Sequence, residues 1–440
     1  MSEGKWPVVS LGELIASIEA GASFRCRETP PEADEVGVAK VSAVSWGRYD
    51  ENESKTCLDA SRIETKLLIQ KGDFLISRAN TVQLVGACVI AERVTKQVML
   101  SDKTLRIQFK DPSLKPWVLH YLRSREGRNQ VEALCTGNQE SMRNISQKSI
   151  RQIQLPLAPA EERDRVIAYL YQQLSRLQAS IEIFGTIQAK LKQARASILK
   201  AAVEGRLVET EAKKSNARLS DHSSSQDQQE GIAIPEGWSI HQAKTVCNSI
   251  ESGTTPSKEH FRDSPDEGVP FIKVYHLTFT GKLSFWENKP TYVSKEYHSS
   301  KMKRSLTVPG DVLTNIVGPP LGKVSVVSSK IHEWNINQAI ARFRCGPDLM
   351  PSFLAIYLQS CQAQSWLEST SKTTTSQINL SISNCRLLPI PIPPLFEQKQ
   401  IVAEVERRFS VLDQVEATVT ASLARCGMLR QAILKRAFGG

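Results

Sequence analysis

The 440-residue sequence lacks the residue patterns on which common enzyme centres depend. Its nine cysteines include no CxxC pair, and its seven histidines show neither HxxxH nor HExxH spacing, so the sequence predicts no metal site. No glycine-rich dinucleotide loop follows a predicted strand, and no Asn-Pro-Pro-aromatic tetrad of an adenine methyltransferase is present. These absences favour a chain without a catalytic centre of its own.

The sequence also lacks an apolar run long enough to cross a membrane, and its first residues do not follow the pattern of a signal peptide. We therefore expect a soluble, cytoplasmic protein whose scattered cysteines are free thiols. Lys and Arg number 56 against 46 Asp and Glu, which gives a net charge of +10. This surplus suits an anionic partner, of which nucleic acid is the commonest.

A long internal repeat organises the chain. Residues 155–170 superpose on 390–405 with a constant offset of 235, which carries Pro156 onto Pro391 and Glu162 onto Glu397. The same offset carries residues 197–205 onto 432–440. Upstream the match is looser, and Trp6 corresponds to Trp238 with an offset of 232. Because the period is far longer than that of solenoid repeats, the pattern indicates a duplicated domain.

The well-matched part of each repeat predicts one long helix of ~40 residues, or ~60 Å. Pro159 and Pro394 precede the helices, where a missing N–H costs least. Apolar residues then alternate spacings of four and three, which is typical of a coiled coil. Arg195 and Arg430 interrupt the stripe at equivalent positions, where they fix the register or face a partner. The predicted seam consists of Leu170, Leu174, Leu177, Phe184, Leu191 and Ile198, and of Val405, Phe409, Leu412, Val419, Leu423 and Ile433.

The divergent part of each repeat predicts a mixed α/β globule. The expected strands of the first globule lie in 37–46, 73–80, 86–94 and 104–109, and those of the second lie in 270–279, 311–317, 322–328 and 339–345. Short helices are expected at Pro116–Arg125 and Pro351–Gln364. Trp6 and Trp238 are interpreted as core residues, and Arg106 and Arg342 as structural residues or contacts to a nucleic-acid backbone.

The predicted fold class is therefore α+β. Two mixed α/β globules alternate with two long helices that pack as an antiparallel coiled coil, so the chain has an internal pseudo-two-fold repeat. The expected domains are a first globule (1–158), a first long helix (159–208), a polar linker (209–234), a second globule (235–393) and a second long helix (394–440).

Two weak patterns keep other functions open. The segment 318–325 approaches a phosphate-binding loop, but it has one residue too few between its glycines and Val324 replaces the Ser or Thr that binds Mg²⁺. Asp266, Glu287 and Lys289 approach the carboxylate-and-lysine pattern of metal-dependent nucleases. A nuclease, and a protein-assembly scaffold that does not bind DNA, are therefore the alternative hypotheses.

Taken together, the segments 391–405, 191–209, 430–440 and 234–238 resemble conserved regions of the specificity (S) subunit of Type I restriction–modification enzymes. The resemblance covers essentially the whole chain. It implies that the globules are target-recognition domains, each of which reads one half of a bipartite, asymmetric DNA site. It also implies that the helix pair sets the spacer and docks two methyltransferase subunits.

The resemblance further implies that this chain is not an enzyme and holds no cofactor. Its partners are double-stranded DNA, the methyltransferase subunits, which use S-adenosylmethionine, and motor-nuclease subunits, which use ATP and Mg²⁺. A system that only methylates is an open variant. Candidate reading residues are polar and aromatic residues on loops after strands: Trp46, Arg48, Tyr49, Arg78, Asn80, Gln139 and Arg143 in the first domain, and Lys273, Tyr275, His276, Asn315, Lys372 and Gln377 in the second.

Overall fold

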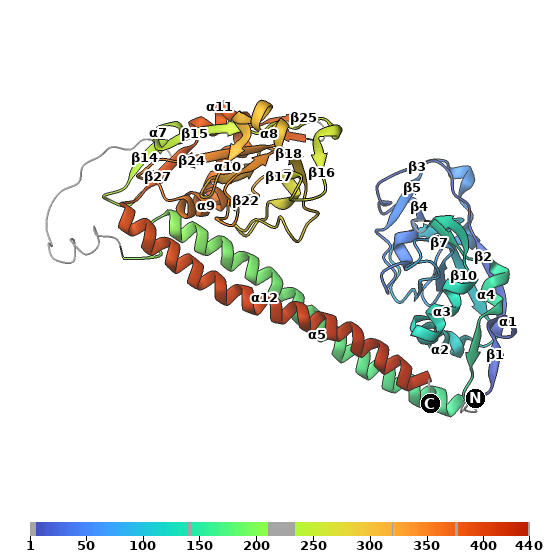
Figure 1. The fold of residues 1–440 in the computed structure, drawn as a ribbon. Helices are drawn as coiled ribbons and strands as arrows, with labels where there is room; N and C mark the ends of the chain where they lie inside the picture. Colours follow the sequence, from blue (N-terminus) through green and yellow to red (C-terminus); the bar gives the residue numbers. More distant parts are fainter. Residues whose placement is uncertain (1–5, 140–141, 210–233, 319, 375–376, 439–440) are drawn as a thin grey trace. The chain divides into compact units, whose positions relative to one another are not determined.

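The computed structural model describes residues 6–139, 142–209, 234–318, 320–374 and 377–438. The chain forms two compact units. The first unit comprises Met1–Gly185 with Thr420–Gly440, and the second comprises Thr186–Val419. Each unit contains one globule and a part of each long helix, α5 (Ala160–Val203) and α12 (Leu395–Phe438) (Figure 1). No helix in the described part of the chain combines the length and apolar character needed to cross a membrane.

The globule of the first unit is built on an antiparallel four-stranded sheet with a second sheet beside it. The first sheet has the order β2 (Ile15–Ala20), β10 (Thr104–Phe109), β6 (Phe74–Ser77) and β8 (Cys88–Ile90). The second has the order β3 (Cys26–Arg27), β5 (Ser54–Cys57), β4 (Val36–Ala39) and β9 (Gln97–Met99), with β4 and β9 parallel.

Two smaller sheets complete this globule. A three-stranded sheet, here called the small sheet, consists of β11 (Thr136–Gln139), β12 (Met142–Asn144) and β7 (Ala79–Asn80). A two-stranded sheet joins β1 (Val8–Ser10) to β13 (Gln154–Pro156), and so brings the start of the globule to the start of α5. The short helices are α1 (Leu11–Leu14), α2 (Lys115–Arg123), α3 (Arg125–Leu134) and α4 (Gln147–Gln152).

The second unit repeats this topology and adds one edge strand. Its sheets have the orders β14-β27, β15-β24-β20-β22, β16-β18-β17-β23 with β19 added at the edge, and β21-β26-β25. The strands are β14 (Ser239–Gln242), β15 (Cys247–Ser252), β16 (Phe261–Arg262), β17 (Gly268–Ile272), β18 (Tyr292–Ser294), β19 (Leu306–Thr307), β20 (Val312–Asn315), β21 (Val317–Gly318), β22 (Val324–Val326), β23 (Trp334–Ile336), β24 (Ile340–Cys345), β25 (Lys372–Thr374), β26 (Gln377–Asn379) and β27 (Pro389–Ile392). Its short helices are α7 (Ala243–Val246), α8 (Lys295–Lys301), α9 (Pro351–Gln359), α10 (Cys361–Ser369) and α11 (Ile382–Leu387).

In each unit the core of the globule is continuous with the apolar face of the long helices. In the first unit Trp117 packs edge-on against Phe438 of α12, with ring centroids 4.9 Å apart, and Leu170 of α5 belongs to the same buried cluster. In the second unit Phe353 is buried with Ala202 of α5 and Val405 of α12. The globule and the helix ends therefore share one hydrophobic core in each unit.

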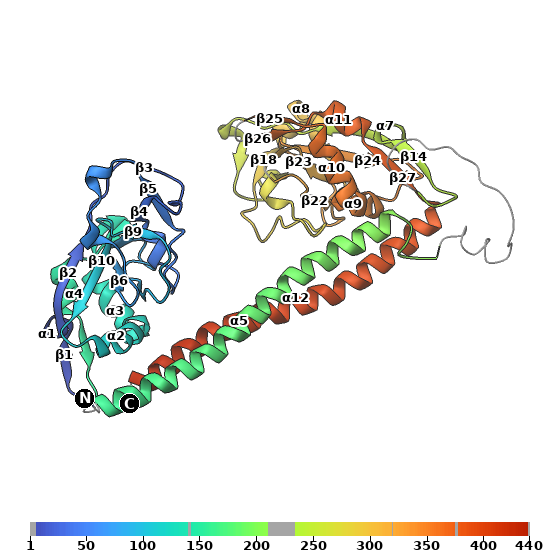
Figure 2. The same cartoon turned by 180° about the vertical axis from the view of Figure 1, so that it is seen from behind.

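The long helices begin where the prolines predict. The N–H of Arg163 donates to the carbonyl of Pro159, and the N–H of Gln398 donates to that of Pro394. Beyond the end of α5, Gly205 has a φ of +63°, a left-handed conformation that favours glycine. α5 and α12 run antiparallel (Figures 1 and 2). In the first unit the start of α5 packs on the end of α12, and in the second unit the end of α5 packs on the start of α12.

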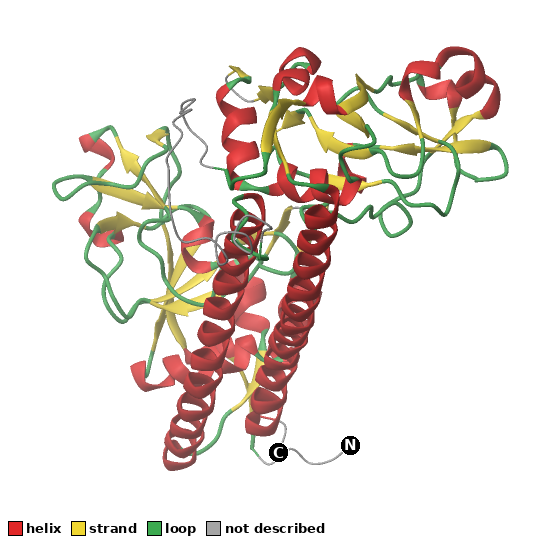
Figure 3. Ribbon diagram, turned by 90° about the vertical axis from the view of Figure 1, so that its left-hand side faces the viewer, coloured by secondary structure: helices red, strands yellow, loops and turns green. Residues whose placement is uncertain are grey.

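All the predicted seam residues are buried or half-buried. The buried ones are Leu170, Leu177, Leu191, Val405, Val419 and Ile433, and the half-buried ones are Leu174, Phe184, Ile198, Phe409, Leu412 and Leu423. The strands are confined to the globules, and each long helix runs unbroken (Figure 3). The predicted α+β fold class is confirmed. The domain limits stay a prediction, and the predicted linker (209–234) lies outside the described residues except for Glu209 and Ile234.

Each unit ties the start of its globule to the start of a long helix by one indole. The Nε1–H of Trp6 donates to Glu162 of α5 at 2.6 Å, and that of Trp238 donates to Glu397 of α12 at 2.8 Å. Both tryptophans are buried, at 8% and 7% exposed, so their interpretation as core residues is confirmed. All nine cysteines are free thiols, as expected.

Some local predictions were wrong. The run 37–46 forms a strand only to Ala39 and then a 3-10 helix, η1 (Val41–Val44), and 270–279 likewise turns into η6 (Val274–His276) after Ile272. The helix expected at Pro351–Gln364 is broken at Ser360, whose hydroxyl caps α10 by accepting from the N–H of Ala363. Ser124 does the same for α3, a helix that was not predicted beyond Arg125.

Candidate nucleic-acid interface

In the first unit, three of the predicted reading residues follow η1. The side chain of Trp46 is 70% exposed and Arg48 is also exposed, whereas Tyr49 is half-buried. The Tyr49 hydroxyl is buried and has no hydrogen-bond partner among the residues that the structure describes. Burial, with Glu51 and Asp50 nearby, raises the pKa of this phenol, so it remains a proton donor at neutral pH.

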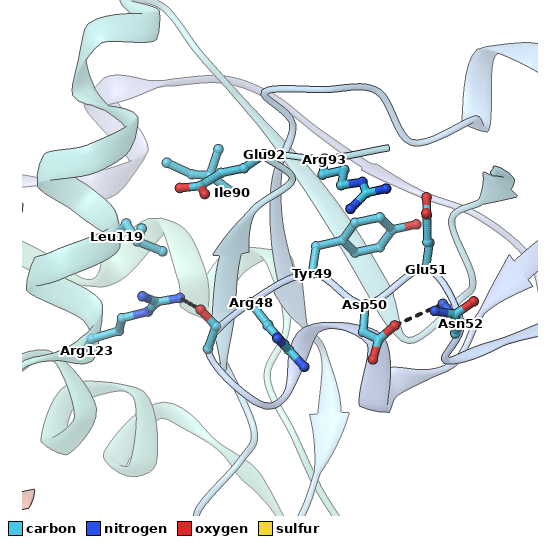
Figure 4. Close-up of a pocket in the computed structure, with 11 residues that line it drawn as sticks. Arg48, Tyr49, Asp50, Glu51, Asn52, Ile90, Glu92, Arg93, Leu119 and Arg123 are labelled. Atoms are coloured by element: carbon cyan, nitrogen blue, oxygen red, sulfur yellow. Dashed lines mark hydrogen bonds between the residues drawn. The ribbon is translucent and has the colours of Figure 1, made fainter. Parts of the chain in front are cut away.

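The same segment lines a pocket of about 520 Å³. Figure 4 shows Arg48, Tyr49 and Arg93 around it, with Arg123 of α2 on the opposite wall. The Arg123 guanidinium donates to the carbonyl of Gly47 at 2.7 Å and to that of Cys88 at 2.8 Å, and so fixes the turn within the segment. The three arginines share this opening with the carboxylates of Asp50, Glu51 and Glu92, so the lining of the pocket is mixed in charge.

The small sheet gathers the other candidates of the first unit. Asn80 on β7 lies opposite Arg143 on β12, and exposed Arg78 immediately precedes β7. The Asn80 amide donates to the Ser45 hydroxyl at 2.9 Å, which attaches the small sheet to the segment of Trp46. Gln139 ends β11, and its side chain lies outside the described residues.

The second unit carries its candidates on the equivalent elements, η6 and a second small sheet. Lys273 and Tyr275 flank the start of η6, the counterpart of η1, and both side chains reach the surface. The Lys273 ammonium lies 4.8 Å from the ring centroid of Phe261 and 5.9 Å from that of Tyr275. Lys372 on β25 and Gln377 on β26 belong to the second small sheet, and their side chains lie outside the described residues.

Two candidates are buried and cannot reach a base in this conformation. His276 is 0% exposed: its Nδ1 accepts from the N–H of Lys273, and its Nε2 lies 3.3 Å from the carbonyl of Lys289. Asn315 is 2% exposed and closes its own loop, since its amide donates to the carbonyls of Val317 and Pro320. We therefore assign both residues a structural role in place of the predicted reading role.

The two strand arginines are structural. Arg106 is buried and donates to Glu19 and Asp73, and to the carbonyls of Lys66 and Leu68. Arg342, its counterpart in β24, is also buried and donates to the carbonyl of Leu306. Neither guanidinium is available to DNA.

The residues of the nuclease alternative do not form a metal centre. Asp266 lies in the turn before β17, Glu287 is exposed and accepts from the Ser284 hydroxyl at 3.3 Å, and Lys289 has a φ of +52° in the following loop. Among the described residues, no group of three or more His, Cys, Asp or Glu side chains could hold a metal ion.

Sequence reasoning missed residues that act through contacts distant in sequence. Ser45, which anchors Asn80, stands 35 positions before it. Met142, 59% exposed next to Arg143, was also missed, although an apolar residue in a polar hairpin was a usable signal. Sequence reasoning also did not name Asp413 of α12. This carboxylate accepts hydrogen bonds from Arg195 of α5 and from Lys282 of the second globule.

The comparisons with known proteins agree with this architecture. Residues 235–423 match the family model of the Type I restriction modification DNA specificity domain. Residues 235–423 thus carry a Type I restriction modification DNA specificity domain. The first globule lies outside the matched residues and has the sheet topology of the second globule apart from β19, so the two globules share one fold.

Relatives and solved structures extend the similarity. The chain is 29% identical to the EcoBI specificity subunit of Escherichia coli over 68% of its own length and 60% of the relative. It is 25% identical to the EcoKI specificity subunit of Escherichia coli K12 over 74% of its own length and 65% of the relative. The match thus spans less than two thirds of each of these relatives. A solved structure from a type I R-M system superposes on this chain with a TM-score of 0.65 and 18% sequence identity. The superposition covers 100% of this chain and 98% of the solved one.

Proposed function

We propose that this chain is the DNA-recognition subunit of a Type I restriction–modification complex. The observation that carries the proposal is the duplicated globule, whose two copies share one topology but carry different residues at the same places. Identical folds present equivalent surfaces, whereas different side chains select different bases. Each globule therefore reads one half of a bipartite site, and the two halves differ.

The two long helices are proposed to set the spacer and to dock two methyltransferase subunits. Several apolar side chains of these helices point away from the seam, and Ile183, Val411 and Met428 are 59%, 52% and 66% exposed. Apolar side chains that lie together on a surface are typical of protein interfaces, and Val415, four positions after Val411 on α12, is also exposed, at 38%. This supports a protein partner on the outer faces of the helices.

The chemistry is assigned to the partners. We propose that methyltransferase subunits supply S-adenosylmethionine-dependent methylation, and that motor-nuclease subunits supply ATP- and Mg²⁺-dependent cleavage. The described residues of this chain contribute a surface of arginine, lysine and aromatic side chains, which suits binding rather than catalysis. The competing nuclease hypothesis predicts that the purified chain cuts plasmid DNA with Mg²⁺ alone, and we expect no cutting.

Mapping methylated adenines in cells that express the complex tests the proposal. We expect a bipartite motif with two unlike halves. Replacing residues 6–155 with the corresponding domain of a relative should change only one half of that motif. If both halves change together, one globule does not read one half-site, and the proposal is wrong.

Salt separates DNA recognition from the alternative of a protein-assembly scaffold. Lys and Arg that neutralise phosphates release counterions, so the affinity of the assembled complex for its site should fall steeply between 50 and 200 mM salt, by ~10³-fold or more for six or more phosphate contacts. A scaffold without DNA readout would show no site preference at any salt concentration.

A further inference from the structure

The small sheets of the two units can be compared position by position. In the first unit Arg143 pairs with Asn80 and Asn144 with Ala79. In the second unit Ile378 pairs with Gly318 and Asn379 with Val317. The same registers place Arg143 and Ile378 at one equivalent position, and Asn80 and Gly318 at another.

This alignment separates scaffold positions from variable ones. Asn144 and Asn379 are the same residue, and both are exposed in strands of the same register. The neighbouring position holds a charged Arg143 in one unit and an apolar Ile378 in the other, although both are half-buried. A backbone that accepts either residue does not need the guanidinium of Arg143 for its fold.

Arg143 is held by its own hairpin and keeps donors unused. Its Nη1 donates to the carbonyl of Gly137, which fixes the side chain across the β11–β12 turn. Its Nε–H is buried and has no partner among the described residues, which form no ion pair with this guanidinium. A ligand cannot reach the buried Nε–H, but Nη2 makes no hydrogen bond in the described part of the chain and is the donor that remains for a ligand.

The surroundings of Arg143 suit a DNA groove. Met142 is 59% exposed beside it, Arg78 is exposed next to the adjacent strand, and Asn80 connects to the segment that carries Trp46. The forked donors of an anchored arginine match the N7 and O6 acceptors of guanine in the major groove.

We propose that Arg143 reads a guanine in the half-site of the first unit, and that the second unit has no equivalent contact because Ile378 occupies the position. Arg143 is then a specificity-determining residue, and Asn80 is a positioning residue. This inference rests on the proposed function, because it presupposes that the small sheet faces DNA.

Methylation mapping with the full complex tests the role of Arg143. R143I introduces the residue of the second unit and should abolish discrimination at one guanine of one half-site, a loss on the order of 10- to 100-fold, while the other half-site stays unchanged. R143K keeps the charge but loses the fork, so it should also lose discrimination at that base. R125I, at an exposed arginine of α3, is the matched control and should leave the motif unchanged.

Each other outcome overturns the inference. If R143I lowers methylation uniformly without altering the motif, and R143K restores it, Arg143 contacts a phosphate. If R143I changes nothing, or changes the half-site of the second unit, the assignment of the base is wrong. In these cases the wild-type complex still yields a bipartite motif. Absence of any motif with the wild-type complex would instead contradict the proposed function.

Discussion

His120 is the most deeply buried titratable residue of α2 and distinguishes the first unit from the second. It is 4% exposed, neither ring nitrogen has a hydrogen-bond partner among the described residues, and its ring centroid lies 5.5 Å from that of Tyr171. Burial, reinforced by Arg123 and Arg430, lowers the pKa of His120 to about 4. The equivalent residue of α9 is Ile356, which shows that the site accepts an apolar side chain.

This lowered pKa predicts acid sensitivity of the first unit. The unfolded chain binds a proton at His120 near its ordinary pKa of 6.5, whereas the folded chain binds it only near about 4. Stability is therefore unaffected above pH 6.5 and falls as the pH drops from there towards 4, by about 2 kcal/mol at pH 5. H120I should remove this contribution, which urea unfolding at pH 7 and pH 5 measures.

H332Q, at an exposed histidine of the second unit, is the control and should retain the pH dependence of the wild type. An H120I protein that lost as much stability as the wild type between pH 7 and pH 5 would contradict the assignment to His120.

At the scale of single residues, the sequence predicted which tryptophans are buried but not which residues they hydrogen-bond to. Trp6 and Trp238 were predicted as core because they recur in both repeats. Their hydrogen bonds to Glu162 and Glu397 join residues 156 and 159 positions apart, and only the folded chain brings them together. His276 and Asn315 were mistaken for surface residues for a different reason: polar residues near the ends of strands can also close their own loops.

Among the elements, the helix pair of the second unit is joined by a polar contact at Arg195. This guanidinium on α5 donates to Asp413 and Glu416 on α12, and lies 5.1 Å from the ring centroid of Phe409. Although burial raises it, hydrogen bonds from Arg195 and Lys282 leave the pKa of Asp413 below its usual value. The prediction that Arg195 fixes the register of the helices is consistent with this pairing.

Replacing Arg195 with Met should weaken the helix pair while keeping the apolar stem in place. Because the Arg195 side chain is only 18% exposed and pairs across two helices, we expect the free energy of unfolding to fall by about 1 kcal/mol. R407M is the matched control, since Arg407 is 67% exposed and pairs with Glu404 of its own helix. Urea denaturation measures both variants, and an equal effect of R407M would contradict the role of Arg195.

Helices and strands that depend on signals close in sequence were predicted well, and those that depend on contacts distant in sequence were not. The long helices were predicted within a few residues because their periodicity and flanking prolines are local signals. The strand at 104–109 was predicted to the residue. The run 37–46 looked equally β-like, but the N–H of Lys40 bonds to Glu53 and the chain then turns into η1. That turn depends on a contact with a later segment.

At the scale of the whole molecule, the repeat was the strongest signal in the sequence. It predicted two globules and two helices, and the structure extends it to every sheet of the two units. The reading surface was only partly predictable. Sequence reasoning chose residues after strands, and the structure gathers Arg78, Asn80 and Arg143 at one small sheet. Their proximity follows from strand pairing, which no local pattern specifies.

The duplication leads to a prediction about the whole chain. If each globule reads its half-site independently, a chimaera in which residues 6–155 are replaced by a second copy of 238–390 should recognise a motif whose two halves contain the same bases. The graft is structurally plausible because Glu162 stands where Glu397 stands in the second unit, so the grafted Trp238 finds an equivalent carboxylate. The reciprocal chimaera, with 6–155 in both places, is the matched control and should give the other half twice. Methylation mapping reads both, and a motif with two unlike halves in either chimaera would show that the identity of a half-site depends on more than its own globule.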